Sequence, residues 1–168
     1  MVAALARLDV GGETVVLRRA VATDVAGIVA LLAADQLGAG RDGGDLAPYL
    51  AALAAIDADP AQLLVVAVDD DGRLAATFQL SFIPGLARRG SLRAQVEAVR
   101  VAPDRRGGGL GRAMITWAVD EARRRGCTLV QLTTDKRRTD ARRFYEGLGF
   151  TATHEGMKLL VAADGDGV

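Results

Sequence analysis

Cysteine is almost absent from the chain, since Cys127 is the single cysteine among 168 residues. One cysteine cannot form a disulfide within the chain or supply a cysteine-rich zinc site. Secreted domains held together by disulfides are therefore excluded. We expect the protein in the reducing environment of the cytoplasm.

Net charge and aromatic residues are also scarce. The 21 basic residues balance the 21 acidic ones, and only 4% of residues are aromatic. A neutral chain lacks the overall field that draws proteins to nucleic acids or anionic membranes, and few rings remain to stack on bases. No apolar run reaches the roughly 18 residues of a membrane span. We expect neither nucleic acid nor membrane as a partner, so any anion site must be local.

What the sequence does contain is enough apolar material for one core. Hydrophobic residues make up 50% of the chain and charged residues 25%, as in ordinary soluble domains. The 168 residues correspond to about one domain at roughly 150 residues per domain. We predict one domain over residues 1–168, with a core from about 14 to 161 and a disordered tail at 162–168.

Hydrophobic periodicity predicts an α+β order of elements. A glycine-rich break from Gly38 to Asp45 separates the first two helices and is a candidate mobile lip. The second to fourth strands should form an antiparallel meander, and the helix between the fourth and fifth should make that pair parallel. No element is assigned to residues 1–10. The predicted strands are 14–19, 63–68, 74–82, 92–101, 128–133, a return strand starting at 149 and a last one at 157–161; the helices begin near Thr23, Leu46, Leu110 and Ala141.

The stretch VRVAPDRRGGGLG, from Val99 to Gly111, carries the clearest chemical signal. A strand ends, a glycine-rich turn follows, and an amphipathic helix opens directly after it. Glycines allow a ligand to approach the backbone, and the unpaired N–H groups of a helix start bind anions. Arg105 and Arg106 add local positive charge. The alternative is a tight strand-to-helix connection that binds nothing.

Two nucleotide motifs fit this stretch poorly. The mononucleotide loop needs Lys and Ser or Thr after its last glycine, but Arg112 and Ala113 follow Gly111. The dinucleotide fingerprint needs a third glycine, which is missing at position 112. A nucleotide-binding domain is therefore a weak alternative.

The pattern Arg106-x-x-Gly109-x-Gly111 resembles the R/Q-x-x-G-x-G/A motif of the GCN5-related N-acetyltransferase (GNAT) superfamily. The segment ARRFYEGLGF, residues 141–150, is similar to a late motif of the same superfamily. Two motifs about 30 residues apart in matching contexts are more specific than one. The resemblance implies a three-layer α+β fold, with a mixed and mostly antiparallel sheet, flanking helices and a splayed parallel pair formed by its fourth and fifth strands.

The resemblance also implies acetyl-CoA as cosubstrate. No His, Asp or Glu cluster has the spacing of metal ligands, so we predict no metal. The pyrophosphate would lie on backbone N–H groups of the turn, and the pantetheine arm would pair with the strand before it like an added strand. Tyr145 takes the position of a tyrosine that protonates the leaving thiolate in many members, whereas Arg138 stands where an asparagine is frequent. The implied cofactor-binding residues are Val99, Val101, Arg106, Gly107, Gly108, Gly109, Leu110, Gly111 and Arg112.

Acyl transfer to an amine requires two proton transfers. At pH 7 only about one lysine-like amine in a few thousand is unprotonated, so a base is needed. Glu97 is the candidate, because period two places it on the strand face of Val99 and Val101 and it could act through a water. Tyr145 is the candidate acid. The bland alternatives are an ion pair of Glu97 with Arg100 and a packing role for Tyr145.

Other reactive residues fit packing or surface roles better. Cys127 begins a strand without any thiolate-activating neighbour, and His154 is a lone histidine near the chain end. We predict an N-acetyltransferase acting on a small-molecule or protein amine, with a homodimer among the assemblies that the resemblance allows. The alternative is a non-catalytic acyl-CoA-binding regulatory module of the same fold.

Overall fold

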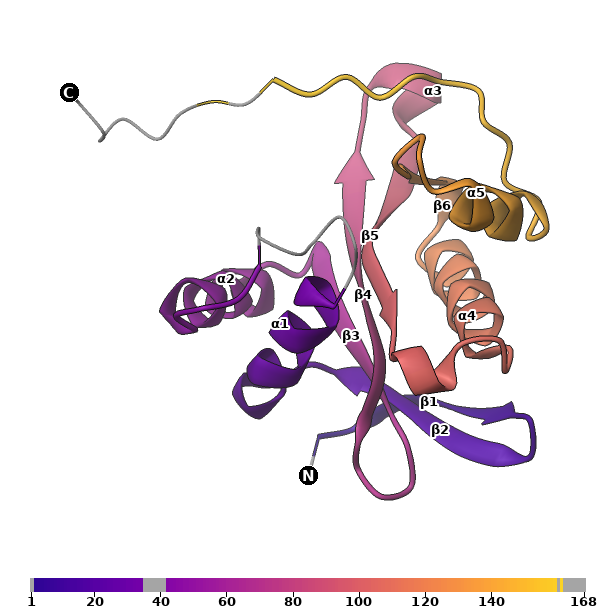
Figure 1. Ribbon diagram of the computed structural model, residues 1–168. Coiled ribbons are helices and arrows are strands. Elements are labelled where there is room, and N and C mark those ends of the chain that lie inside the picture. The colour runs from indigo at the N-terminus through magenta and orange to yellow at the C-terminus, as the bar shows by residue number, and fades with distance from the viewer. Residues whose placement is uncertain (1, 35–41, 160, 162–168) are drawn as a thin grey trace. The chain divides into compact units, whose positions relative to one another are not determined.

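The computed structural model describes residues 2–34, 42–159 and 161. Its strands form one six-stranded sheet in the order β1-β2-β3-β4-β5-β6, in which only β5 and β6 are parallel neighbours (Figure 1). The strands are β1 (Ala4–Val10), β2 (Glu13–Arg19), β3 (Gln62–Val68), β4 (Leu74–Pro84), β5 (Leu92–Val101) and β6 (Cys127–Leu132). The helices are η1 (Ala22–Asp24), α1 (Val25–Ala33), α2 (Ala47–Ala58), α3 (Ala87–Gly90), η2 (Pro103–Arg105), α4 (Leu110–Arg124) and α5 (Thr139–Glu146).

The chain divides into two compact units, Met1–Leu132 and Thr133–Val168. The first contains the whole sheet and the helices up to α4, and the second contains α5. Each unit is described by itself. Residues 38–41 of the glycine-rich break and the predicted tail at 162–168 lie outside the described residues.

The N-terminal strand β1 corrects the sequence prediction. Residues 1–10 were expected to form no element, but Ala4–Val10 pairs antiparallel with β2. Gly11 and Gly12 both adopt positive φ in the connecting turn, at 64° and 86°, which two-residue hairpin turns require. Because this strand comes first, the parallel pair is the fifth and sixth strand rather than the fourth and fifth. The predicted bounds of these two strands, 92–101 and 128–133, agree with β5 and differ from β6 by one residue.

The two strands predicted after α5 are wrong. Residues 149–159 contain no strand, and the alternating side chains of Met157, Leu159 and Val161 are 94%, 89% and 87% exposed. An apolar alternation forms a strand only when backbone groups find a partner and one face is covered. Neither condition is met for these three residues in the part of the chain that the structure describes.

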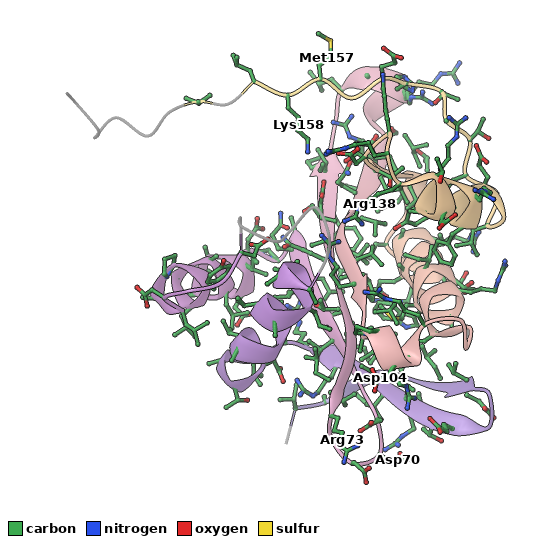
Figure 2. All side chains as sticks on the ribbon, viewed as in Figure 1. Asp70, Arg73, Asp104, Arg138, Met157 and Lys158 are labelled. Atoms are coloured by element: carbon green, nitrogen blue, oxygen red, sulfur yellow. The ribbon has the colours of Figure 1, made fainter. Side chains whose placement is uncertain are left out.

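The expected meander of β3, β4 and β5 is confirmed. The β3–β4 hairpin closes on the carboxylate of Asp69, which accepts hydrogen bonds from the N–H groups of Asp71 (3.1 Å) and Arg73 (2.8 Å). Asp70 and Arg73 project from this tip (Figure 2). An aspartate that bonds the backbone two residues ahead is a typical turn former, so the DDDG stretch defines the hairpin.

Different helices cover the two faces of the sheet, α1 and α2 on one and α4 on the other (Figure 1). Val66 and Val68 of β3 belong to a buried cluster with residues of α1 and α2. On the other face, Phe78 of β4 meets Trp117 of α4 edge-on, with ring centroids 6.0 Å apart. Strands buried on both faces have nearly continuous apolar sequences, which explains the run LLVVAV.

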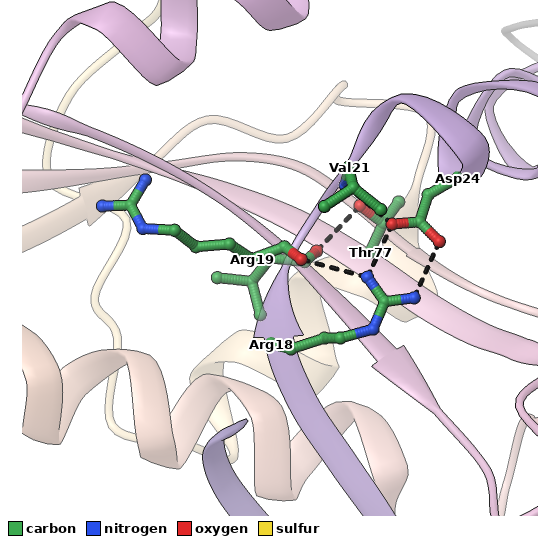
Figure 3. A network of polar contacts seen from close by, with 6 residues as sticks. Arg18, Arg19, Val21, Asp24 and Thr77 are labelled. Carbon is green, nitrogen blue, oxygen red and sulfur yellow. Dashed lines mark hydrogen bonds and ion pairs between the residues drawn. The ribbon is translucent and has the colours of Figure 1, made fainter. Parts of the chain in front are cut away.

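An ion pair connects the end of β2 to the first helical turn (Figure 3). The Arg18 guanidinium donates to both carboxylate oxygens of Asp24, at 2.6 and 2.8 Å, and the N–H of Val21 donates to the same carboxylate at 2.8 Å. Burial alone would raise the pKa of Asp24, but these hydrogen bonds bring it below its ordinary value. The contact aligns α1 on the sheet.

A second ion pair lies at the end of α4. The buried carboxylate of Glu121 accepts hydrogen bonds from Arg124 (2.7 and 2.8 Å) and Arg125 (2.7 Å). Arg125 also lies over the ring of Phe82, 4.0 Å from its centroid, and donates to the carbonyl of Pro60 at 3.3 Å. Burial opposes ionisation of Glu121, but the two arginines leave its pKa below the ordinary value. These contacts connect the end of α4 to β4 and to the residues before β3.

Candidate functional site

A bulge interrupts β5 at Ala98. Glu97 lies opposite Gln79 of β4, and Arg100 lies opposite Thr77, so three residue steps on β5 match two on β4. Ala98 takes up the extra residue with a φ of 51°, in the left-handed region. Opposed residues share a face of a sheet, so Glu97 shares its face with Arg100. The prediction that Glu97 shares a face with Val101 by period two is therefore wrong, because the bulge breaks the alternation.

The second half of β5 has no partner strand on its β6 side among the described residues. Parallel pairing runs from Leu92 to Val96 on β5 and from Cys127 to Leu132 on β6, where β6 ends. The strand continues past this point to Val101. Val99 and Val101, the residues expected to pair with pantetheine, lie in this half. An edge of this kind can take an additional extended segment.

The glycine-rich turn follows directly through η2. Gly107 and Gly109 have φ angles of 79° and 90°, which L-residues with side chains rarely adopt. The first hydrogen bond into α4 runs from the N–H of Ala113 to the carbonyl of Gly109 at 3.0 Å. The N–H groups of Gly109, Leu110 and Gly111 make no hydrogen bond to any described residue, and no side chain caps the helix. Three consecutive free donors at the positive end of a helix are able to bind an anion, so this turn is a candidate anion site.

Space around the turn fits a ligand rather than tight packing. A Cβ built on Gly107 or Gly108 would meet no atom within 4 Å, and on Gly109 it would meet only Val10 Cγ1 at 4.0 Å. Gly108 has no positive φ, so neither crowding nor its φ explains this glycine. A group that approaches the exposed backbone would explain it.

The arginines before the turn contact the protein itself. Arg106 donates from Nε to the carbonyl of Val101 at 3.0 Å, and Arg105 pairs with Glu13 of β2 at 2.7 Å. They join the turn to the end of β5 and to the N-terminal hairpin. Arg112 is exposed in the first turn of α4, where its charge adds to the field of the anion site.

Glu97, the candidate base, is exposed and oriented by amide side chains. Gln95 donates from Nε2 to Glu97 Oε1 at 2.9 Å, and Gln131 of β6 donates to Gln95 Oε1 at 2.6 Å. A carboxylate only accepts hydrogen bonds, so it fixes the orientation of both amides in turn. The sequence prediction of the site did not include these glutamines, although polar residues at period two in an otherwise apolar strand indicate a polar face.

The second unit contains Tyr145, the candidate acid. Tyr145 is half-buried on α5, with its ring edge-on to Phe144 (5.1 Å between centroids) and to Phe150 (5.9 Å). Arg138 occupies the N-cap position of α5. Just before the helix, hydrogen bonds from Arg137 hold the pKa of Asp135 far below its ordinary value. The aromatic cluster fixes the orientation of the Tyr145 ring.

The remaining candidates have surface or packing environments. Burial raises the pKa of the Cys127 thiol, against a smaller opposing effect of Arg125, which disfavours the thiolate. His154 is exposed and lies 2.7 Å from the hydroxyl of Thr153. Across residues 2–34, 42–159 and 161, no three His, Cys, Asp or Glu side chains gather as a metal ion would require. Over the same residues, no helix is both long and apolar enough to cross a membrane.

A parallel strand pair whose longer member leads into a glycine turn at a helix start is the arrangement that the resemblance to the N-acetyltransferases implied. Residues 29–150 match the Acetyltransferase (GNAT) family, and the chain belongs to that family. This confirms the resemblance drawn from the two sequence motifs and the α+β fold that it implied.

Three known proteins illustrate the similarity. A transcriptional regulator from Bacillus halodurans C-125 has a solved structure with 41% identity and a TM-score of 0.84, covering 88% of this chain and 99% of that one. Glucosamine 6-phosphate N-acetyltransferase of Trypanosoma brucei brucei is 35% identical over 88 residues, 52% of this chain and 58% of that protein. A predicted acetyltransferase from Clostridium acetobutylicum, crystallised with acetyl-CoA, shares the fold at 21% identity and a TM-score of 0.68, covering 87% of this chain and 96% of that one.

The matches to curated relatives are partial in length. The chain spans 39% of the first of these proteins and 58% of the second. They support an acetyltransferase class.

Proposed function

We propose that this chain is a single-domain N-acetyltransferase that transfers the acetyl group of acetyl-CoA to a primary amine by direct attack. The proposal depends on one observation. The half of β5 that has no partner on its β6 side among the described residues leads through η2 to the N–H groups of Gly109, Leu110 and Gly111, which bond no described residue. An extended pantetheine arm and a pyrophosphate need an edge strand and an anion site in that order.

Backbone groups of the protein, rather than side chains, would bind the cosubstrate. The pyrophosphate would accept hydrogen bonds from the turn between Gly107 and Arg112, and the pantetheine amides would pair with the backbone of Val99 and Val101. Arg106 would act indirectly, because its contact with Val101 holds the turn against the strand. A neighbour of the same fold was crystallised with acetyl-CoA, which supports this choice of cosubstrate.

The reaction needs one bond made, one broken and two protons moved. The amine nitrogen attacks the thioester carbonyl carbon, the C–N bond forms, and the C–S bond breaks to release the CoA thiolate. Glu97, through a water, would accept the proton that the nitrogen loses, and Tyr145 would donate a proton to the sulfur. The N–H of Val99 would hydrogen-bond the carbonyl oxygen as it gains charge.

The acceptor class is inferred from the relatives and from the surroundings of Glu97. Relatives that match part of the chain include N-acetyltransferases of glucosamine 6-phosphate and of aminoalkylphosphonates. We propose a primary amine, with small molecules favoured over protein amines because the exposed Glu97 lies among hydrogen-bonding side chains suited to a small polar ligand.

The test combines thiol release with cosubstrate binding. A panel of amines is incubated with acetyl-CoA, and free CoA is measured for the wild type and for the variants Glu97→Gln and Tyr145→Phe. Loss of a general base or acid should reduce kcat by roughly 10² to 10⁴. The Kd for acetyl-CoA, measured by calorimetry, should remain unchanged.

Matched controls separate chemistry from folding. Tyr49→Phe removes the hydroxyl of the chain's other tyrosine, which bonds Gly43 and Asp42, and Glu155→Gln neutralises an exposed carboxylate paired with Lys136. Both should retain wild-type turnover. Binding of acetyl-CoA without thiol release for any amine would refute the enzyme and indicate a regulatory acyl-CoA-binding module. Absence of acetyl-CoA binding would refute both.

A further inference from the structure

A row of polar side chains crosses four strands of the sheet beside Glu97. Leu64 of β3 packs under α1 and α2, and its cross-strand neighbour Gln79 is in turn opposite Glu97. Opposed residues share a face, so this row lies on the face that α1 and α2 cover. We name it the glutamine row; its members are Gln62, Gln79, Ser81, Gln95, Glu97 and Gln131.

Hydrogen bonds fix which amide atoms of the row remain available. Gln62 Oε1 accepts from Gln79 Nε2 (2.9 Å) and from Ser81 Oγ (2.6 Å). Gln131 donates to Gln95, which donates to Glu97. Among the described residues, the carbonyl oxygens of Gln79 and Gln131 and the amide nitrogen of Gln62 are left without a partner. All three glutamines are half-buried, and none of these three atoms is fully shielded from solvent.

Arg93 lies on the same face, two residues before Gln95. Its Nε is buried and has no hydrogen-bond partner in the part of the chain that the structure describes. The reason is local, because its cross-strand neighbours are Ile83 on β4 and Leu129 on β6. Neither side chain can accept a hydrogen bond. A shielded guanidinium nitrogen without an acceptor is costly, and an anion close to this guanidinium would offset a cost that no described residue offsets.

The charged residues of this face lie along β5 in the order Arg93, Glu97 and Arg100, and Arg100 donates to the carbonyl of Val99 at 2.8 Å. The acceptor-only Glu97 and the free oxygen of Gln79 are suited to an ammonium or amine, and Arg93 is suited to an anion. Four residues of an extended strand separate Glu97 from Arg93, a Cα distance of at most about 13 Å. The side chains of Gln95 and Gln131 lie between them and offer neutral hydrogen bonds.

We infer that this face binds an acetyl acceptor carrying both a primary amine and an anionic group, with Arg93 as the residue that selects the anion. This inference rests on the proposed N-acetyltransferase activity for the identity of its ligand as an acceptor. Binding of the ligand itself requires only the geometry of the face. The anion is a phosphate or a carboxylate on the acceptor molecule.

The experiment compares amines that differ only in the anion. The probes are linear amino alcohols with two to six carbons, their phosphate monoesters, and ω-amino carboxylates of the same lengths. Their Kd values are measured by calorimetry on the full chain saturated with CoA, and KM and kcat by thiol release with acetyl-CoA. Charge-assisted hydrogen bonds predict at least about tenfold tighter binding of one anionic series over the alcohols.

Variants assign this preference to one residue. Arg93→Gln should abolish the preference and raise KM for the anionic amines, leaving kcat, the Kd for acetyl-CoA and the binding of the amino alcohols unchanged. Arg93→Lys should retain part of the preference, which shows that the effect follows charge rather than folding. The control Arg73→Gln alters an exposed arginine of the β3–β4 hairpin and should change nothing.

The outcomes separate this inference from the proposed function. Equal Kd values for alcohols and anionic amines, or a preference that survives in Arg93→Gln, would overturn the inference even if the amines are acetylated. A preference that disappears in Arg93→Gln would support it even if no thiol is released, and the proposed transfer reaction would then be the part that fails. If the phosphates bind and the carboxylates do not, or the reverse, the source of the anion is identified.

Discussion

Replacing Gly109 by Glu tests the anion site most directly. Gly109 opens α4 with a φ of 90°, and its N–H is one of the three unpaired donors. A glutamate there adds a negative charge and side-chain bulk next to the expected pyrophosphate. We expect acetyl-CoA binding to weaken severely.

The expected effect of Gly109→Glu has two parts: backbone strain, which lowers the stability of the fold, and the added charge, which weakens acetyl-CoA binding. An L-residue in the left-handed region costs about 1–2 kcal/mol, which lowers Tm by roughly 2–8 °C in a chain of this size. Two like unit charges about 5 Å apart repel by about 1 kcal/mol in water-like surroundings and about 3 kcal/mol near a protein surface. The charge alone should therefore raise the Kd for acetyl-CoA roughly fivefold to 200-fold.

The matched control is Gly109→Ala, which carries the same backbone strain without the charge. Calorimetric titration with acetyl-CoA should give a clearly higher Kd for the glutamate variant than for the alanine variant, and the gap should narrow at high salt because screening weakens the repulsion. Thermal melts should show similar Tm values for the two. Equal Kd values in folded protein would refute the reasoning and move the pyrophosphate away from this turn.

Three further predictions concern stability. Asp24→Asn should destabilise the fold by about 1–3 kcal/mol in urea unfolding, because Arg18 loses its charged partner. The pKa of Asp24 is lowered in the folded state, so its stabilising contribution is present above about pH 4 and is lost as pH falls through the folded pKa. The wild type and the variant should therefore converge in stability in acid. Glu121→Gln should lower Tm at pH 7, and the same sign makes this loss shrink below about pH 4 in melts followed across pH. Phe78→Ala should cost about 3–5 kcal/mol in urea unfolding by leaving a cavity beside Trp117, and a loss under 1 kcal/mol would contradict the packing described here.

The sequence predicted the elements whose signals are local. The apolar run before DDDG and the alternation after it identify β3 and β4, and the spacing from Leu110 with a glycine at 126 defines α4. The hairpin of β1 was readable too, because Gly11 and Gly12 between two alternating segments are a hairpin signal.

The candidate site depends on register, which a single sequence shows poorly. Both motifs are recognisable from their residues alone. The glycine turn follows β5 as expected, and the first part of the late motif lies in α5, whereas Gly149 and Phe150 start no strand. Nothing in the sequence marks Ala98 as a bulge, because an alanine seldom adopts a φ of 51°. Gln79 becomes a neighbour of Glu97 only through strand pairing, so the glutamine row appears only when the sheet is assembled.

The bulge at Ala98 sets the angle between the two halves of β5, because an extra residue bends a strand and increases its local twist. With one residue fewer, two steps on β5 would match two on β4, so Glu97 and Arg100 would keep their common face while the ladder ran straight. The bend would be lost, and the free edge at Val101 would then extend in another direction from the carboxylate of Glu97.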